Sequence, residues 1–335
     1  MTASPSLKLL LAGLAFAALS GAALAQTAFD LSVEQPGRLK AERNAEAIAA
    51  IPADYKWASA GAFTVAVSPW DPPIATYAVD STSVVVGVDP DLASLIADSL
   101  GLTLNLVPTA WADWPLGVTS GKYDVVISNV TVTEERKEKF DFSSYRQDVL
   151  GFYVRSDSPI TAVTEPKDIA GLKVITGAGT NQEKIILEWD RQNVEAGLAP
   201  IEIQYYDDSA ASTLALQSGR ADVEFNPNPT LSYSSAVTGD TRLVGVQSGG
   251  WPLKAEIAAT TRKDSGLAAA ITIAINGLIE NGLYAQTLER WNVSAMTSVS
   301  LAWKLGSSRP RRSARALMTS WFERVSPGRW IKAGP

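Results

Sequence analysis

The segment SNVTVTEERKEKFDFSSY, residues 128–145, contains the polar turn, the helix start and the arginine from which the fold can be inferred. It follows Asp124–Ile127, an acid and three apolar residues that predict a buried strand. Open α/β sheets bind ligands beyond the carboxyl ends of their strands, where a polar turn leads into a helix. Thr133 is a residue type that caps helix N-termini, so we expect a short helix to begin at Glu134.

Arg136 falls in the first turn of that helix, near the polar residues Ser128, Asn129 and Thr131. Its guanidinium offers a planar fork of donors that can hold both oxygens of a carboxylate. The alternative is a surface arginine paired with an acid of the same segment, Glu134 or Asp141. An isolated T-x-x-R would favour that alternative, but the motifs around it favour a binding site.

Other short motifs follow one another along the chain. They are GVDPDL (87–92), GKYD (121–124), TEER (133–136), DFSSY (141–145), LKV (172–174), GT (179–180), GRAD (219–222), NGLY (281–284) and RW (290–291). In this order and at this spacing they resemble the bacterial extracellular solute-binding proteins of family 3, the amino-acid-binding components of ABC importers. The resemblance extends over about residues 61–293.

The resemblance implies an α/β, periplasmic-binding-protein-like fold, in which two Rossmann-like lobes are joined by a two-strand hinge. Ligand binding closes such a hinge. Strands alternate with helices in the sequence, as in parallel βαβ units. The expected organisation is a signal peptide (1–25), an N-terminal preface (26–60), the first part of lobe 1 (61–150), lobe 2 (151–254), the return of lobe 1 (255–293) and a basic, poorly ordered tail (294–335).

Two helices can be placed from the residues at their ends. Asp89 is expected to cap a helix that ends at Gly101 and buries Leu92, Leu95, Ile96 and Leu100. Thr180 is expected to cap a second helix, in which Glu183 completes a capping box. The apolar residues expected to face the core from this second helix are Ile186, Leu187 and Val194.

The resemblance also implies the binding-site residues. Arg136 would hold the ligand carboxylate, Ser128 would offer backbone polar groups, and Thr131 would donate from its hydroxyl. Asn129, in the same turn beside Arg136, is included among the ligand-binding residues. Across the cleft, Gly179, Thr180 and Asn181 begin a helix, whose free N–H groups suit an anion.

Three residues near the N-terminal part of the predicted cleft complete the candidate site. Trp111 occupies the position where the family places an apolar side chain against the ligand, and Trp70 and Asp71 lie near its N-terminal aromatic contact. A tryptophan can stack on an aliphatic or cationic group of a ligand. Core packing is the competing interpretation for Trp70, Trp111 and Trp114.

One position departs from the family pattern. The family holds the ligand's α-ammonium with an aspartate five residues after the aspartate of G-R-x-D, and here that position is Pro227. Its neighbours Asn226 and Asn228 are included in the candidate site, but they are neutral. Either Asp71 or Glu224 compensates, or the ligand is not an ordinary α-amino acid.

The first 25 residues have the pattern of a secretory signal. Lys8 supplies a positive charge, Leu9–Ala18 an apolar run, and Ala23–Ala25 a small-x-small cleavage site, so cleavage after Ala25 would release the protein into the periplasm. The alternative, a membrane anchor, is disfavoured because the apolar run is short and interrupted. The sequence contains no cysteine, and therefore neither a disulfide framework nor the cysteine to which lipid anchors are attached.

Composition excludes several classes of function. With no histidine and no cysteine, the chain has no Ser-His-Asp or Cys-His centre, and no cofactor is expected. No EF-hand spacing, dinucleotide fingerprint or phosphate-binding loop occurs. The net charge is −6, although residues 304–335 contain eight basic residues and one acid. The remainder is therefore more acidic than the total indicates, which argues against nucleic-acid binding.

The leading hypothesis is a monomeric periplasmic protein that captures an amino acid or a similar small carboxylate-bearing solute and delivers it to an inner-membrane ABC permease. One alternative is an enzyme on the same fold that resembles cyclohexadienyl dehydratase, for which Glu224 is the candidate acid. A second is a ligand-sensing partner of a receptor.

Overall fold

The computed structural model describes residues 29–206 and 208–293, in which two five-stranded sheets dominate. The first has the order β4-β1-β5-β12-β6 and comprises β1 (Ala62–Val67), β4 (Thr103–Pro108), β5 (Val125–Val126), β6 (Phe140–Gln147) and β12 (Glu256–Arg262). The second has the order β11-β7-β10-β8-β9 and comprises β7 (Val149–Arg155), β8 (Lys173–Ile175), β9 (Glu202–Gln204), β10 (Val223–Pro227) and β11 (Thr241–Ser248). A separate hairpin pairs β2 (Thr76–Tyr77) with β3 (Val85–Val86).

Each large sheet has its own helices, and we call the two assemblies lobe 1 and lobe 2. Lobe 1 contains α1 (Ala45–Ala49), α2 (Val88–Leu100), the 3-10 helix η1 (Trp111–Asp113), α3 (Trp114–Thr119), α4 (Glu134–Lys137), α8 (Leu267–Glu280) and α9 (Leu283–Arg290). Lobe 2 contains the 3-10 helix η2 (Pro166–Ile169), α5 (Asn181–Glu195), α6 (Ser209–Gln217) and α7 (Asn228–Thr238). The predicted α/β fold with two lobes is confirmed.

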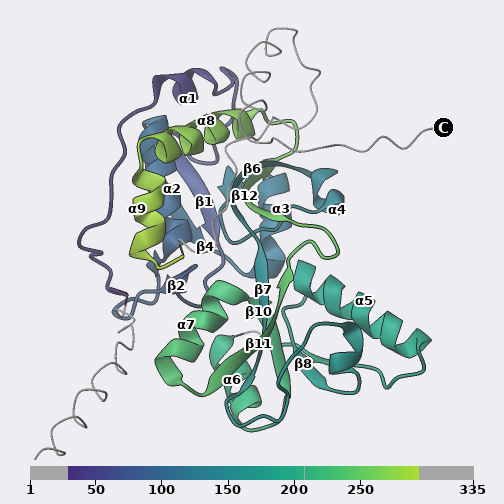
Figure 1. Ribbon diagram of the computed structural model, residues 1–335. Helices are drawn as coiled ribbons and strands as arrows, with labels where there is room; N and C mark the ends of the chain where they lie inside the picture. Colours follow the sequence, from purple (N-terminus) through teal and green to yellow (C-terminus); the bar gives the residue numbers. More distant parts are fainter. Residues whose placement is uncertain (1–28, 207, 294–335) are drawn as a thin grey trace, which may run out of the picture. The chain divides into compact units, whose positions relative to one another are not determined.

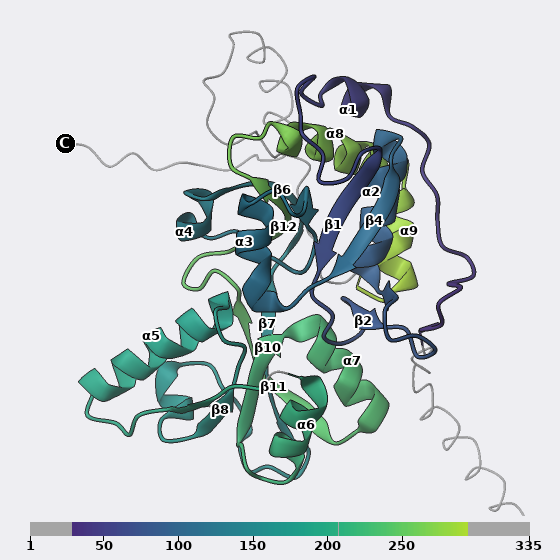
Figure 2. The ribbon, with the colours of Figure 1, turned by 180° about the vertical axis from the view of Figure 1, so that it is seen from behind.

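Alternate residues of the lobe 1 strands pack against different helices. Val65 and Val125 belong to a core formed with α2, α8 and α9, whereas Ala66 and Val126 pack with α3. Figure 1 shows α2 and α9 on one side of β1 and α3 on the other. Strand side chains alternate between the two faces of a sheet, so a sheet covered on both faces needs apolar residues at every position. The central strands β4, β1 and β5 are parallel, and β1 and β4 lie side by side in Figure 2.

Lobe 2 follows the same rule with one polar exception. Val223 and Phe225 of β10 pack in a core with Trp189 of α5, where the rings of Phe152 and Phe225 stack at 4.0 Å. The intervening residues Glu224 and Asn226 are also buried, at 6% exposure each, but they are polar. Strand β10 therefore carries a carboxyl group into the interior of the lobe.

The chain crosses between the lobes twice. It leaves lobe 1 at Asp148, the single residue between β6 and β7, and returns through the segment between β11 and β12. The crossings are hydrogen-bonded to each other, because the Asp148 N–H donates to the Ala255 carbonyl at 3.0 Å and the Gly249 N–H to the Asp148 carbonyl at 3.2 Å. A Cβ atom on Gly249 would lie 1.8 Å from Oδ2 of Asp148, so the close approach requires glycine there.

The prediction for α2 was correct for its core and its end but wrong for its cap. Gly101 ends the helix in the left-handed conformation, and the four predicted core residues are all no more than 3% exposed. Asp89, however, lies inside the helix, which begins after Gly87. Its buried carboxylate instead accepts the Asn129 N–H at 2.8 Å and the Tyr145 hydroxyl at 2.9 Å, so it holds the turn that begins the binding segment.

The prediction for α5 was partly wrong. Thr180 caps the helix by accepting the Glu183 N–H at 3.2 Å, as expected. The Glu183 carboxylate, however, accepts the N–H of Gly179 at 2.7 Å rather than that of Thr180. Leu187 and Val194 are exposed, at 49% and 53%, and the apolar residues that face the core are Ile185, Ile186 and Trp189.

Asp71 of lobe 1 reaches lobe 2. Together with Glu224 of β10 it lines a cavity of about 20 Å³, and burial raises the pKa of Asp71 to about 7. A hydrogen bond with Ser209 opposes this rise in pKa, and the negative charge of Glu224 adds to it. Burial also raises the pKa of Glu224, against the hydrogen bonds from Asn226 and Ser212. The two lobes therefore meet at a pair of carboxyl groups that resist ionisation.

Two adjacent residues of α5 test the packing of lobe 2. Ile186 is fully buried and Leu187 is half exposed. We expect Ile186→Ala to lower the free energy of unfolding by about 2–5 kcal/mol and Leu187→Ala by no more than about 0.5 kcal/mol. Urea denaturation measures both, and equal losses would contradict the orientation of α5.

The carboxyl pair predicts a pH dependence. An aspartate whose pKa is higher in the folded protein than in the unfolded chain destabilises the fold as pH rises from about 4 to about 7. We expect Asp71→Asn to become more stable relative to the wild type over this range and to keep a constant advantage above it. A pKa change of this size corresponds to at most about 4 kcal/mol of stability, and partial solvent exposure reduces this figure.

Thermal unfolding of the wild type and of Asp71→Asn at several pH values tests this prediction. The control is Asp54→Asn, a substitution at an exposed residue. A pH-independent difference would contradict the burial of Asp71.

Candidate functional site

Arg136 lies beside a pair of tryptophans and contacts both lobes. Thr133 caps α4 by accepting the Arg136 N–H at 3.2 Å, as predicted. The guanidinium carbon lies 5.6 Å from the ring centroids of both Trp111 and Trp114. Nη1 donates to the Thr131 carbonyl at 2.9 Å, and Nη2 donates to the Gly179 carbonyl of lobe 2 at 3.4 Å.

The two acids proposed as surface partners of Arg136 have other partners. Glu134 pairs with Lys137 at 2.7 Å, and Asp141 pairs with Lys263 at 3.1 Å. Burial lowers the pKa of Arg136, and the negative charges of Asp148 and Glu135 oppose this effect. The guanidinium is thus a partly buried cation whose hydrogen-bond acceptors are neutral carbonyls.

Thr131, Asp148 and Asn181 form a buried cluster next to Arg136. Oδ2 of Asp148 accepts the Thr131 hydroxyl at 2.6 Å and Nδ2 of Asn181 at 2.9 Å. Nδ2 of Asn181 also donates to the Gly249 carbonyl at 2.9 Å, and Oδ1 of Asn181 lies 2.9 Å from the Thr131 hydroxyl. The cluster therefore joins lobe 1, lobe 2 and both crossings.

Asp148 was not among the predicted site residues. Burial raises its pKa, while the hydrogen bonds from Thr131 and Asn181 and the charges of Arg146 and Arg136 lower it. Its position carries a sequence signal, since Asp148 is an acid between two segments that both have the composition of buried strands.

The lobe 2 residues near Arg136 form the start of α5. Gly179 has a positive φ of 69° and exposes its carbonyl to Arg136. The Thr180 hydroxyl donates to the Gly177 carbonyl at 2.5 Å. The structure therefore brings Gly179, Thr180 and Asn181 to the same place as Arg136, Thr131 and Trp111.

The side chains of Ser128 and Asn129 hold the turn in place. Oγ of Ser128 accepts the Ser68 N–H at 2.7 Å. Asn129 has a positive φ of 52°, and its side-chain oxygen accepts a hydrogen bond from Arg146. The Asn129 N–H is also engaged, since it donates to Asp89. What these two residues could offer a ligand is therefore the backbone of Ser128 and the carbonyl of Asn129.

The remaining predicted residues are more dispersed. Asn226 donates to Glu224 at 3.0 Å and accepts from Gln182 at 3.3 Å, while the side-chain oxygen of Asn228 accepts the Tyr153 hydroxyl at 3.0 Å. Trp70 is 36% exposed. Core packing does account for Trp114, which is 2% exposed and lies against Phe140.

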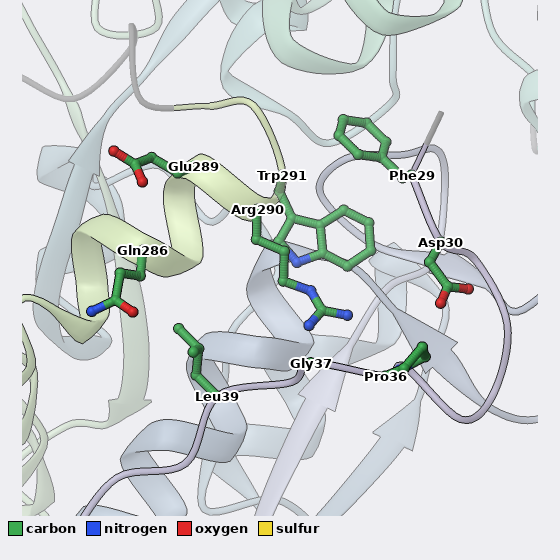
Figure 3. A pocket seen from close by; sticks show the side chains of 9 residues that line it. All are labelled: Phe29, Asp30, Pro36, Gly37, Leu39, Gln286, Glu289, Arg290 and Trp291. Carbon is green, nitrogen blue, oxygen red and sulfur yellow. The ribbon is translucent and has the colours of Figure 1, made fainter. Parts of the chain in front are cut away.

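A larger cavity, of about 510 Å³, lies between the N-terminal preface and α9, and Figure 3 shows its lining. The guanidinium of Arg290 lies beside the indole of Trp291 there, and both side chains bind Asp91 of α2, at 3.3 and 2.8 Å. Arg290 also donates to Gln35 at 2.6 Å. These contacts fasten the preface and α9 to α2, which is a structural role.

In the part of the chain that the structure describes, no group of three or more acids is arranged to hold a metal ion. No single helix between residues 29 and 293 is long and apolar enough to span a membrane; α8 and α9 meet the criterion only together, across an 81° bend.

Known proteins with similar sequences and structures include several binding proteins and also an enzyme. The L-cystine-binding protein TcyJ of Escherichia coli is 35% identical over 41% of this chain, so the match spans about half of that relative's length (49%). The amino-acid ABC transporter substrate-binding protein AbpA of Streptococcus pneumoniae, solved with L-arginine, has a TM-score of 0.61 and 25% identity, covering 70% of this chain and 96% of its own. Cyclohexadienyl dehydratase of Pseudomonas aeruginosa is 25% identical over 41% of this chain and 49% of its own length.

The family model for bacterial extracellular solute-binding proteins, family 3, matches residues 63–294, which is more than half of the chain and includes both lobes. Its relatives support a binding role, and the two-lobe fold agrees with it. The chain belongs to the bacterial extracellular solute-binding proteins of family 3.

Proposed function

We propose that this protein binds an amino acid and that Arg136 holds the ligand's α-carboxylate. The observation that carries the proposal is the environment of Arg136, a cation beside two tryptophan rings whose hydrogen-bond acceptors are the carbonyls of Thr131 and Gly179. A buried charge is costly unless a group of opposite charge accompanies it. A ligand carboxylate bound beside Arg136 would supply that charge in a bidentate geometry.

The start of α5 would complete the carboxylate site from lobe 2. The helix is 15 residues long, and its first N–H groups carry a partial positive charge. Thr131 and Asn181, which contact each other across the lobes, would lie beside the ligand carboxylate. Trp111 would cover the ligand beside Arg136.

The cellular role follows from family membership and from the N-terminal segment. Residues 1–25 would direct export and be removed after Ala25, and the mature monomer would deliver its ligand from the periplasm to an ABC permease. Residues 1–28 lie outside the described residues, as does the basic tail 294–335. Amino acids with a second amino or guanidino group are the first candidates, because relatives are named for binding L-cystine or were solved with L-arginine.

An enzymatic function has one observation in its favour, the similarity to cyclohexadienyl dehydratase. Glu224, the acid that such a function would use, is buried and bonded to Ser212 and Asn226. It does not contact Arg136 or Thr131, which hold the proposed carboxylate site. We therefore propose binding without catalysis, and turnover of prephenate or arogenate by the purified protein would contradict this.

A thermal-shift screen of amino acids, including L-arginine and L-cystine, followed by calorimetry, tests the function. A ligand at about 100 times its Kd adds about 2.7 kcal/mol of stability. We expect Arg136→Ala to weaken binding by at least about 30-fold, because the ligand carboxylate would lose its countercharge.

The control for this prediction is Arg191→Ala. Arg191 also belongs to a helix but forms exposed ion pairs with Glu188 and Glu195, so its removal should leave binding unchanged. Unchanged affinity in Arg136→Ala, or equal losses in the two variants, would show that the carboxylate binds elsewhere.

A further inference from the structure

Asp148 has a buried oxygen that lacks a partner. The residue is 3% exposed, and Oδ2 accepts both hydrogen bonds of the cluster, from Thr131 and Asn181. Oδ1 is equally buried, and within residues 29–206 and 208–293 it has no hydrogen-bond partner. A buried carboxylate oxygen without a donor is costly, so its retention needs a reason.

The nearest cation does not supply that partner. Arg146 lies two residues away and its charge lowers the pKa of Asp148, but its terminal nitrogen donates to Asn129. Its Nε is itself buried, with no partner among the described residues. No ion pair within 4.0 Å joins Arg146 and Asp148 in the part of the chain that the structure describes.

The orientation of the Asp148 carboxylate is fixed by its surroundings. The backbone of Asp148 is bonded to Ala255 and Gly249, and Gly249 approaches so closely that a Cβ atom there would overlap Oδ2. The side chain therefore has little room to rotate. A rigid, buried and partly unsatisfied acceptor is a suitable receptor for a cationic donor.

Thr131 places this acceptor beside Arg136. Its carbonyl accepts Nη1 of Arg136, and its hydroxyl donates to Oδ2 of Asp148. The guanidinium of Arg136 and the carboxylate of Asp148 are therefore both bonded to Thr131. An amino acid carries a carboxylate and an ammonium on one carbon atom, so its carboxylate could pair with Arg136 while its ammonium pairs with Asp148.

We propose that Oδ1 of Asp148 accepts the α-ammonium of the ligand. This assignment rests on the proposed function, since it presupposes a carboxylate at Arg136. It also accounts for Pro227, because a carboxylate from the hinge replaces the one that lobe 2 lacks at that position. The ligand is then an ordinary α-amino acid.

The other two candidate carboxylates are less suitable. Asp71 and Glu224 both line a cavity of about 20 Å³, which holds little more than one water molecule. The lining of that cavity comes from Asp71, β7, α6, β10, α7 and β11, and it includes none of the residues that contact Arg136. A group held at Arg136 therefore has Asp148, rather than this pair, as its neighbour.

The test compares amino acids with the same molecules lacking the α-ammonium. The probe pairs are L-arginine with 5-guanidinopentanoate and L-cystine with 3,3′-dithiodipropionate, measured by calorimetry on the wild type and on Asp148→Asn. We expect Asp148→Asn to weaken binding of the amino acid by at least about 30-fold and to leave the affinity for the deaminated analogue unchanged. Asp71→Asn should change neither. Asp148→Ser replaces Asp148→Asn if the latter does not fold.

Two results would overturn the assignment while leaving the proposed function intact. In one, Asp148→Asn binds the amino acid as the wild type does, while Arg136→Ala does not. In the other, Asp148→Asn loses the amino acid and the deaminated analogue equally, as a purely structural residue would. A wild-type protein that binds neither L-arginine, L-cystine nor any standard amino acid would overturn both the function and the assignment.

Discussion

The pair of crossings between the lobes is the constraint on which the rest of the structure depends. Strand β12 enters the first sheet between β5 and β6, although it follows all of lobe 2 in the sequence. Lobe 1 is therefore completed only when the chain has returned, and the two crossings must lie side by side. The contacts of Asp148 with Gly249 and Ala255 are a direct consequence of this topology.

Opposite charges are concentrated where the crossings meet the two lobes. Arg136 is a cation with neutral acceptors, and Asp148 is a carboxylate with one oxygen unpartnered among the described residues. Both lie next to Thr131, but Arg136 stacks on the rings of Trp111 and Trp114 and Asp148 is held by the hinge. The two charges already stabilise each other in part, since Asp148 opposes the fall in the pKa of Arg136 and Arg136 opposes the rise in the pKa of Asp148. In the proposed site, a zwitterion would add a charged partner for each of them.

Local patterns in the sequence predicted much of the fold. The spacing of Leu92, Leu95, Ile96 and Leu100 predicted the buried face of α2 correctly. Positions on one face of a helix recur with a period of 3.6 residues, and these four residues follow that period. The same prediction was wrong for α5, because its apolar residues do not all lie on one face of the helix. Ile186 is buried there, whereas Leu187 and Val194 are exposed. Asp89 illustrates a different failure. Its position in the sequence is typical of a helix cap, but its carboxylate binds Asn129 and Tyr145 instead, which are 40 and 56 residues away.

The binding segment was recognisable because its residues lie close together in the sequence. Thr133 and Arg136 needed only a turn and one helix start. The family motifs pointed to the residues of lobe 2 that lie near them, Gly179 and Asn181. Asp148 was missed because its partners Thr131 and Asn181 are 17 and 33 residues away, and a single acid between two strands has no local signature of a site. The family pattern instead predicts the residue that binds the ammonium at position 227, where this chain has a proline.

The central claim is that one amino acid bridges Arg136 and Asp148, and a crystal structure of the protein with L-arginine, or with L-cystine if that is the ligand, tests it most directly. The account predicts the ligand carboxylate within hydrogen-bonding distance of both terminal nitrogens of Arg136 and the α-ammonium at Oδ1 of Asp148. A complex in which the ammonium contacts Asp71 or Glu224, with Oδ1 of Asp148 still unpartnered, would contradict it.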